Sequence, residues 1–295
     1  MQSKIEQPLP IFIVHWNRPL ECIRTVECLL KQDLPLRISI VDNASELENY
    51  QVLVGHLPVE VNVIRLEENK GWGGGLNVLL RNWLKDKDDG QDYCFISAHD
   101  ALPQGQCLSM LLKSAQDDPK IGIACPEPGS SNDLPIYSPV RGPRLFPSPP
   151  NSLGKVESVD FAHATLFLVS KECLKEIGTF DERYFAYGDE CDIALKARRF
   201  GWKVALIWGA IVINPITGTS KPIISYLFAR NTLLLALTYG GRRHAVARMF
   251  LMFVNTLRLS LMPPLKRAGL SPLARLIGIR DFLMGRYGAP PVNLK

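Results

Sequence analysis

The chain has 295 residues, of which 46% are hydrophobic and 21% charged. This composition is typical of a folded protein with a buried core and is too apolar for disorder. Its seven cysteines are dispersed without a Cys-x-x-Cys pair, which indicates buried thiols in a reducing compartment and argues against a disulfide framework or a zinc site. The N-terminal segment 1–10 has no apolar core typical of a signal peptide, so we expect a cytoplasmic protein.

The net charge of +5 is unevenly distributed along the chain. Residues 221–295 contain twelve Lys or Arg and one acid, Asp281, whereas residues 1–220 contain 22 bases and 28 acids. A basic end on an acidic body predicts an anionic partner for the last quarter. Because these bases alternate with apolar runs such as Met249–Val254, we expect a membrane surface as the partner and no nucleic acid. No run is long enough to span a bilayer, so peripheral contact with the inner face of the cytoplasmic membrane is predicted.

In the first hundred residues, short apolar runs alternate with segments of helical spacing. Strands are predicted at residues 11–14, 38–41, 61–66 and 93–97, and helices at 20–31, 49–55 and 76–84. This order predicts an α/β fold with a Rossmann-like, mainly parallel sheet and helices on both faces. The loops at 15–19, 42–45, 67–75 and 98–102 are then expected at the carboxyl edge of the sheet, where such folds bind ligands.

The second half contains fewer strand signals. Residues 127–150 are rich in Pro, Gly and Ser and predict an extended loop. A strand at Phe161–Ser170 and helices at Lys171–Ile177 and Asp189–Phe200 are expected after it. Apolar residues at helical spacing between Val246 and Leu261 predict a C-terminal amphipathic helix. We therefore expect one domain over residues 1–235 and a basic helical segment over 236–295.

Several short motifs occur in one order along the chain. They are His15-Trp-Asn-Arg-Pro19, Val41-Asp-Asn-Ala-Ser45, the glycine-rich segment Asn69–Asn77, His99-Asp100, the segment Gly178–Asp192 and Arg198–Trp202. This ordered set resembles family 2 glycosyltransferases, the inverting enzymes of the A-type glycosyltransferase fold. It looks closest to the rhamnosyltransferase-like branch that builds bacterial surface polysaccharides. The resemblance spans nearly the whole chain and includes Ala229-Arg-Asn231 and Arg280–Gly288.

The resemblance implies a nucleoside diphosphate sugar as donor and a hydroxyl of a cell-surface or lipid-linked glycan as acceptor. Deoxythymidine-diphosphate rhamnose is the first donor expected, followed by uridine-diphosphate sugars. The donor-binding residues implied are Trp16, Asn17, Asp42, Asn69, Gly71, Gly74, Asn77 and Arg230.

Two of these donor motifs also have a chemical rationale. A carboxylate at a strand's carboxyl end, such as Asp42, can accept hydrogen bonds from a base or ribose, although Asp is also common in turns. Four glycines among residues 71–75 let the backbone approach a phosphate closely, although such a segment can be a plain turn.

A divalent cation is the cofactor that the resemblance implies. Relatives carry an Asp-x-Asp motif, which holds Mg²⁺ or Mn²⁺ against the diphosphate, whereas this chain has Ala98-His99-Asp100. Asp100 is therefore the expected ligand, and His99 a weaker candidate. A His that relatives place after the catalytic helix corresponds here to Asn214. These departures are consistent with either weak metal binding or a metal-independent mechanism.

The catalytic base is expected at the start of the last predicted helix of the domain. An inverting transfer needs one carboxylate to take the acceptor proton, and relatives use the second residue of Glu-Asp-x-Asp. This chain has Asp189-Glu190-Cys191-Asp192, so Glu190 is the expected base, with Asp189 as its substitute. Acids in a first helical turn are also favoured by the helix dipole alone. Asp192 and His163 are predicted near the acceptor, although His163 also fits a buried core position.

Two functions are alternatives to glycosyl transfer. A catalytically degenerate family member that binds a nucleotide or glycan is consistent with Ala98 and Asn214, although the retained pair Asp189 and Glu190 argues against it. A dinucleotide-dependent dehydrogenase needs a glycine-rich turn directly after its first strand, and residues 14–19 contain none.

Overall fold

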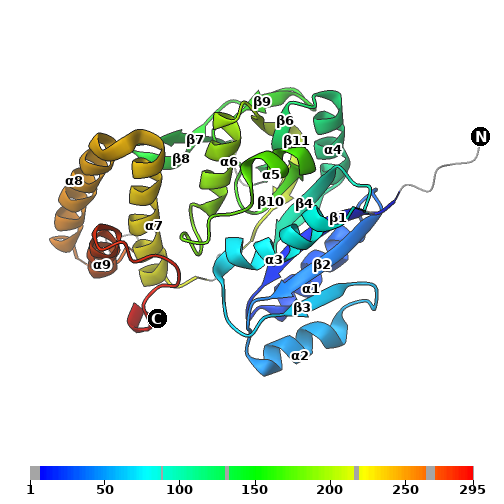
Figure 1. The fold of residues 1–295 in the computed structure, drawn as a ribbon, viewed down its shortest axis with the longest axis horizontal. Helices are drawn as coiled ribbons and strands as arrows, with labels where there is room; N and C mark the ends of the chain where they lie inside the picture. The colour runs from blue at the N-terminus through cyan, green and yellow to red at the C-terminus, as the bar shows by residue number, and fades with distance from the viewer. Residues whose placement is uncertain (1–6, 88, 130–132, 216–218, 264–269, 295) are drawn as a thin grey trace, which may run out of the picture.

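The computed structural model describes residues 7–87, 89–129, 133–215, 219–263 and 270–294. A nine-stranded sheet forms the centre, and helices cover both of its faces (Figure 1). The strands are β1 Leu9–His15, β2 Leu36–Asp42, β3 Asn62–Arg65, β4 Tyr93–Ala98, β5 Leu102–Gln104, β6 Ile121–Pro128, β7 Asp133–Ser138, β8 Gly142–Pro147, β9 Val156–Ser158, β10 Leu166–Ser170 and β11 Lys203–Ile213. The α-helices are α1 Pro19–Leu29, α2 Leu47–His56, α3 Gly71–Lys85, α4 Cys107–Asp117, α5 Lys171–Ile177, α6 Asp189–Arg199, α7 Lys221–Leu235, α8 Gly241–Ser260 and α9 Pro272–Leu283.

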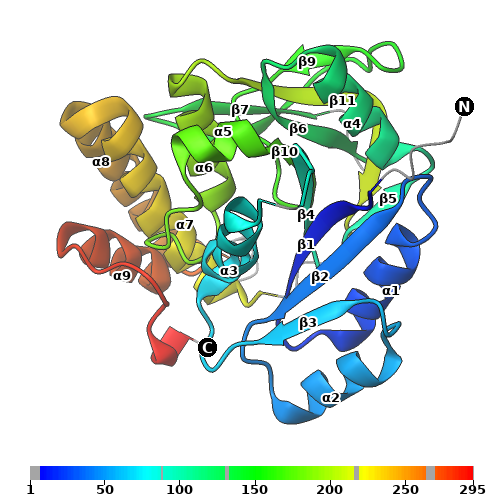
Figure 2. The same cartoon turned by 45° about the vertical axis from the view of Figure 1, so that its right-hand side comes forward.

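The sheet has the order β3-β2-β1-β4-β10-β6-β11-β5, with β9 paired to β11. The first four strands are mutually parallel, as are β6 and β11, while β10 runs antiparallel between β4 and β6. The predicted mainly parallel α/β fold is confirmed. His15 pairs with Asp42, and Asp42 with Arg65, so the carboxyl ends of these strands share one edge of the sheet (Figure 2).

Alternation along the strands creates two hydrophobic layers. Ile11 and Ile13 face the layer that includes residues of α1, α2 and α4. Phe12 and Val14 face the layer that includes residues of α3, α5 and α6. The carboxyl edge between these layers is thus held rigidly from both sides.

Helix α4 and strands β5, β6, β9 and β11 have no counterpart in the sequence expectation, and three predicted segments differ from it clearly. Helix α3 begins at Gly71, five residues before the expected Leu76, because the glycines form its first turns. The predicted loop 127–150 contains the hairpin β7–β8, so that prediction was wrong for its centre. Of the residues that suggested a loop, Pro139 lies in the turn of this hairpin, whereas Ser138, Gly142 and Pro143 lie within its strands. Strand β10 begins at Leu166 and is shorter than the predicted Phe161–Ser170.

The three C-terminal helices form one layer at the side of the sheet domain (Figure 1). A π-helical turn, Ala236–Gly240, joins α7 directly to α8, and α9 packs against both helices. The expected boundary between residues 235 and 236 thus falls at a helix-to-turn junction within this layer. Within the part of the chain that the structure describes, no helix has the length and apolarity required to cross a membrane.

Candidate functional site

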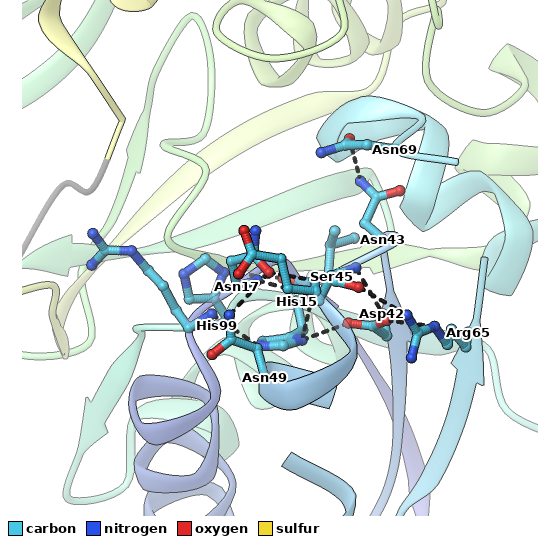
Figure 3. A network of polar contacts seen from close by, with 12 residues as sticks. His15, Asn17, Asp42, Asn43, Ser45, Asn49, Arg65, Asn69 and His99 are labelled. Atoms are coloured by element: carbon cyan, nitrogen blue, oxygen red, sulfur yellow. Dashed lines mark hydrogen bonds and ion pairs between the residues drawn. The ribbon is translucent and has the colours of Figure 1, made fainter. Parts of the chain in front are cut away.

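A buried histidine–carboxylate pair joins the ends of β1 and β2 (Figure 3). His15 Nε2 accepts a hydrogen bond from the Arg18 backbone N–H (3.1 Å), so its proton lies on Nδ1, which donates to Asp42 Oδ1 (2.9 Å). The Ser45 backbone N–H donates to Asp42 Oδ2 (3.3 Å). Burial favours a higher pKa for Asp42, but the hydrogen bonds from His15 and Ser45 outweigh it and lower the pKa. The Asp42 carboxylate is fully buried and holds the strand ends together.

Arg65, the last residue of β3, was missed by the sequence analysis. Its guanidinium lies over the Tyr50 ring, 4.4 Å from the centroid, and donates to the Ser45 carbonyl (2.9 Å). Its Nε is 3.7 Å from Asp42 Oδ2. Arg65 and Trp16 are both exposed, so they are accessible groups at this edge of the sheet. A basic residue at a strand's carboxyl end was the signal that could have found Arg65.

Asn17 fixes the loop after β1 in a left-handed backbone conformation (φ 52°). Its side-chain oxygen accepts hydrogen bonds from the Glu46 backbone N–H (2.7 Å) and from Asn49 Nδ2 (3.2 Å). Its own backbone N–H donates to Ser45 Oγ (2.9 Å). Asn17 therefore connects the first two loops of the predicted donor edge.

Asn43 connects β2 to the glycine-rich segment and was also missed. Its Nδ2 donates to Asn69 Oδ1 and to the Gly71 carbonyl (both 2.9 Å), while its Oδ1 accepts from the Lys70 backbone N–H (2.9 Å). Figure 3 shows Asn43 and Asn69 pointing toward one another. Its position in the loop directly after Asp42 was the available signal.

Beside Asn69 lies a cavity of about 230 Å³, lined by Glu68, Asn69, Lys70, Glu182, Phe185, Gly288 and Ala289.

The first turn of α3 packs against the segment that leads into α6. Gly71 has φ +76°, and a Cβ there would overlap the Phe185 carbonyl. The Trp72 backbone N–H donates to that carbonyl (2.6 Å), and the Gly73 backbone N–H donates to Asp189 Oδ2 (3.1 Å). These backbone donors, expected to face a phosphate, are used by acceptors of the protein itself. The glycines therefore permit the close approach of α3 and α6.

Gly74 and Asn77 lie on the same side of α3. A Cβ at Gly74 would lie 2.9 Å from the Lys70 Cβ, so this position too is tightly packed. Asn77 is fully buried, and its Nδ2 donates to the Phe180 carbonyl and to Glu182 Oε1 (both 2.9 Å). Its Oδ1 accepts from the Phe180 backbone N–H (3.0 Å). The Asn77 amide, expected to contact the donor, instead fixes the segment 180–182 to α3.

Two adjacent acids begin α6 in different environments. Asp189 is 1% exposed, and its pKa is raised well above the usual value, first by burial and then by the charge and hydrogen bond of Glu190. Glu190 is partly exposed, and its Oε2 accepts a hydrogen bond from the Gly188 backbone N–H (2.9 Å). The accessible carboxylate of this pair is therefore Glu190.

The two predicted acceptor residues are held inside the protein. Asp192 Oδ1 accepts hydrogen bonds from the hydroxyls of Tyr184 (3.1 Å) and Tyr239 (2.9 Å), and burial raises the pKa of this carboxyl. His163 Nε2 donates to the Pro126 carbonyl (2.7 Å), and burial lowers the pKa of its imidazole. Asp192 thus joins α6 to the turn before α8, and His163 joins its loop to β6.

Asn231 of α7 is bonded to the loop that precedes α6. Its Nδ2 group donates to the carbonyls of Tyr184 (2.9 Å), Ala186 (2.7 Å) and Tyr187 (2.8 Å). In this loop Phe185 and Tyr187 have positive φ values of 67° and 64°, an unfavourable conformation for residues with a Cβ. Asn231 is fully buried, so its amide holds three loop carbonyls that have turned inward.

Arg230 is bonded to the same loop. Its guanidinium is fully buried and donates to the carbonyls of Tyr184 (3.0 Å) and Gly288 (2.8 Å) and to Asn231 Oδ1 (3.0 Å). Burial lowers the pKa of this side chain. The resemblance predicts that Arg230 contacts a diphosphate. In the structure, its N–H groups instead donate to acceptors in the protein interior.

The end of β4 presents the candidate metal ligands. Asp100 Oδ1 accepts a hydrogen bond from Asn214 Nδ2 (3.2 Å), and burial raises the pKa of Asp100. His99 Nδ1 donates to the Val14 carbonyl (3.2 Å), which leaves Nε2 as its possible metal-binding atom, and burial lowers its pKa. Within the described ranges, no three His, Cys, Asp or Glu side chains are grouped as metal ligands. One carboxylate and one imidazole fit a cation whose other ligands come from diphosphate and water.

The chain matches a family model and resembles solved structures. Residues 11–178, more than half of the chain, match the family model "Glycosyl transferase family 2". No curated protein matches. A crystal structure of GalNAc-T7 with UDP, GalNAc and Mn²⁺ has 14% identity and a TM-score of 0.62, and the alignment covers 98% of this chain and 59% of that one. The mannosyltransferase PcManGT from Pyrobaculum calidifontis, in complex with GDP-Man and Mn²⁺, has 15% identity and a TM-score of 0.59, with 94% and 87% covered.

These comparisons differ in what they show. At such low identity the two structures establish the shared fold, and this chain spans little more than half of GalNAc-T7. The family match runs from β1 to the end of α5, so it includes the strand-end network and stops before Asp189 and Glu190. On this match the chain belongs to glycosyl transferase family 2.

Proposed function

We propose that this glycosyltransferase moves a sugar from a nucleoside diphosphate to a glycan hydroxyl with inversion, and that Glu190 is the base. The partly exposed Glu190 beside the buried Asp189 carries the proposal. The acceptor oxygen forms a bond to the anomeric carbon while the bond from that carbon to the diphosphate breaks. The acceptor proton passes to Glu190, so a single carboxylate is enough for the step. Asp189 lies buried beside it, and its pKa is raised by burial and by the charge of Glu190.

The nucleotide part of the donor is assigned to the edge formed by β1, β2 and β3. Trp16 and Arg65 offer exposed aromatic and cationic groups there, which suit a base and a phosphate. Asn17 and Asn69 shape the neighbouring loops, and the buried Asp42 supports this edge through His15. Gly71, Gly74 and Asn77 set the position of α3 beside the donor. In this proposal Asn77 and Arg230 act through the protein and do not contact the donor.

A divalent cation is assigned to Asp100, with His99 as a second ligand. Mn²⁺ is present in the structures of GalNAc-T7 and PcManGT described above. The carboxylate of Asp100 suits this ion or Mg²⁺. The ion would neutralise the charge that develops on the departing diphosphate. Because Ala98 supplies no carboxylate, we expect weak binding of the cation in the absence of a nucleotide.

Rhamnose carried on deoxythymidine diphosphate is the proposed donor, on the resemblance to the rhamnosyltransferase-like branch. The proposed acceptor is a lipid-linked or cell-surface polysaccharide intermediate. The pair of tyrosines bonded to Asp192 and the loop of His163 would shape the acceptor side. A peripheral position on the inner face of the cytoplasmic membrane would bring the protein to such an acceptor.

A non-catalytic nucleotide- or glycan-binding protein is the second candidate. The residue that favours it is Ala98, which replaces the first carboxylate of the usual metal motif. This candidate predicts that a nucleotide or a glycan binds and that no sugar is transferred or hydrolysed from any donor.

A donor panel distinguishes the two candidates. Calorimetric binding and nucleoside diphosphate release are measured with deoxythymidine-, uridine- and guanosine-diphosphate sugars, each with Mn²⁺, Mg²⁺ or EDTA. We expect binding and release for one nucleotide class, with affinity lowered by EDTA. Binding without release from any donor would favour the second candidate. No binding of any nucleotide would contradict the proposed transfer and leave the second candidate in its glycan-binding form.

A further inference from the structure

We propose that the outward face of α8 is a docking surface for an anionic lipid bilayer. This deepens the proposed function, on which it rests, by naming the membrane-contacting part of the chain. The α8 outer face is defined as Val246, Phe250, Phe253, Val254 and Leu257 of the helix together with Leu261, the residue that follows it.

Helix α8 has a buried side of mixed composition and, opposite to it, an uncovered apolar side. The buried side consists of Ala245, Arg248, Met252 and Thr256, and Met252 packs against residues of α7 and α9. The six residues of the α8 outer face follow a separate stripe at spacings of three and four and are 44 to 89% exposed. Figure 1 shows α8 at the outer edge of the C-terminal helices. A continuous exposed apolar stripe of this kind marks a binding surface.

The charges around this face are all basic. Arg242, Arg243 and Arg258 are exposed on α8, and the helix contains no acid. The single acid after residue 220 is Asp281, which is buried and accepts hydrogen bonds from Tyr226 and Arg280. The surface therefore combines apolar side chains with uncompensated arginines, the pattern of helices that lie in a lipid headgroup region.

Charge also argues against a second copy of the chain as the occupant. Two identical α8 outer faces would bring arginines together without any acid on either helix to offset them. A bilayer containing anionic headgroups supplies the opposite charge and an apolar layer below it. The cationic residues of α8 also exclude a spanning arrangement, because their burial in hydrocarbon is unfavourable. We therefore expect α8 to lie parallel to the membrane surface.

Vesicle co-sedimentation of the full chain tests this surface. The probes are phosphatidylcholine vesicles and vesicles in which phosphatidylglycerol replaces part of the phosphatidylcholine. Two double variants alter the face: Phe250→Ser/Leu257→Ser and Arg242→Gln/Arg243→Gln. The matched control is Val59→Ser, which removes an exposed apolar side chain that is distant from α8 in the sequence. Thermal melting shows whether each variant is folded, and size-exclusion chromatography reports its oligomeric state.

We expect the wild type and Val59→Ser to bind the anionic vesicles, with binding weakened by salt. Both α8 variants should lose most of this binding while they melt like the wild type. Wild-type protein that stays in solution with both vesicles, or α8 variants that bind like the wild type, would overturn the proposal. A wild-type dimer that the Phe250→Ser/Leu257→Ser variant dissociates, without vesicle binding, would assign the face to a second copy and overturn it as well. Vesicle binding with no release of diphosphate from any donor would leave the surface standing and contradict only the proposed function.

Discussion

Two neighbouring acids in one helical turn have different environments, and the proposed chemistry rests on this difference. Asp189 is buried against the first turn of α3, where it accepts a hydrogen bond from the Gly73 backbone N–H. Glu190 projects from the same turn and remains partly exposed. A side chain one methylene longer than aspartate reaches further from the helix, which suits a residue that takes a proton from a bound acceptor. Although the two residues are adjacent in the chain, their side chains differ in burial.

The raised pKa of Asp189 predicts a pH-dependent cost in stability. A carboxyl whose pKa is higher in the folded state destabilises the fold as pH rises above its unfolded pKa, near 3.8, and the cost continues to grow up to its folded pKa. Asp189→Asn has no such titration and keeps an oxygen for the Gly73 N–H. We therefore expect the variant to melt close to the wild type at about pH 4 and increasingly above it as pH rises.

Melting temperatures of both proteins at several pH values check this expectation. The difference, variant minus wild type, should be positive at neutral pH and should increase between acidic and neutral conditions. A difference that does not change with pH, or one that favours the wild type as pH rises, would contradict the burial argument for Asp189.

At the scale of elements, the loop between Tyr184 and Gly188 determines where α6 begins. Phe185 and Tyr187 have positive φ values, so this loop is unfavourable on its own and depends on its partners. The partners come from α3, which donates to the Phe185 carbonyl, and from α7, whose Asn231 donates to three others. In the proposed mechanism, α7 would therefore act on the site through this loop.

Asn231→Ala tests this positioning role. Loss of the amide removes the Asn231 donor from the partly buried Ala186 and Tyr187 carbonyls, which costs about 1–3 kcal/mol of folding stability, while the Tyr184 carbonyl keeps its bond from Arg230. The loop shift should lower kcat on the order of 100-fold, because reacting groups misplaced by about 1 Å lose that much rate. Donor binding should stay close to the wild type, since the donor edge on β1 to β3 does not involve Asn231.

The matched control is Asn82→Ala, the same change on the exposed side of α3. Its kcat, donor affinity and melting temperature should equal those of the wild type. If Asn231→Ala only melts earlier and keeps its kcat at a temperature where it is folded, Asn231 supports the fold alone. A large loss of donor affinity would instead place Asn231 in the donor site.

At the scale of the whole molecule, the sequence predicted the succession of strands and helices along the first hundred residues well. The apolar runs around Ile11–Val14 and Ile38–Val41 are buried on both sides, and such runs are recognisable without tertiary information. The helix Lys171–Ile177 was predicted with its observed bounds, and Ser170 caps it by accepting from the Cys173 backbone N–H. The family match and both structural neighbours agree with this architecture.

What the sequence did not predict depends on contacts between distant segments. The glycines at 71–75 suggested a phosphate-binding loop, yet their spacing follows from the approach of Phe185 and Asp189, more than a hundred residues later. Arg230 and Asn231 suggested a cation for the diphosphate, whereas their donors meet carbonyls of another loop. The hairpin in residues 127–150 was missed because Pro- and Gly-rich composition does not reveal strand pairing.

The central claim is that Glu190 is the base of a glycosyl transfer that the rest of the fold prepares. The most direct measurement compares Glu190→Gln with the wild type and with Glu172→Gln, the same change on the exposed surface of α5. Donor binding and release of nucleoside diphosphate are followed with the donor selected by the panel. We expect Glu190→Gln to bind the donor like the wild type and to lose transfer by about 100- to 10,000-fold, while Glu172→Gln keeps full activity. Transfer by Glu190→Gln at the wild-type rate would contradict the account.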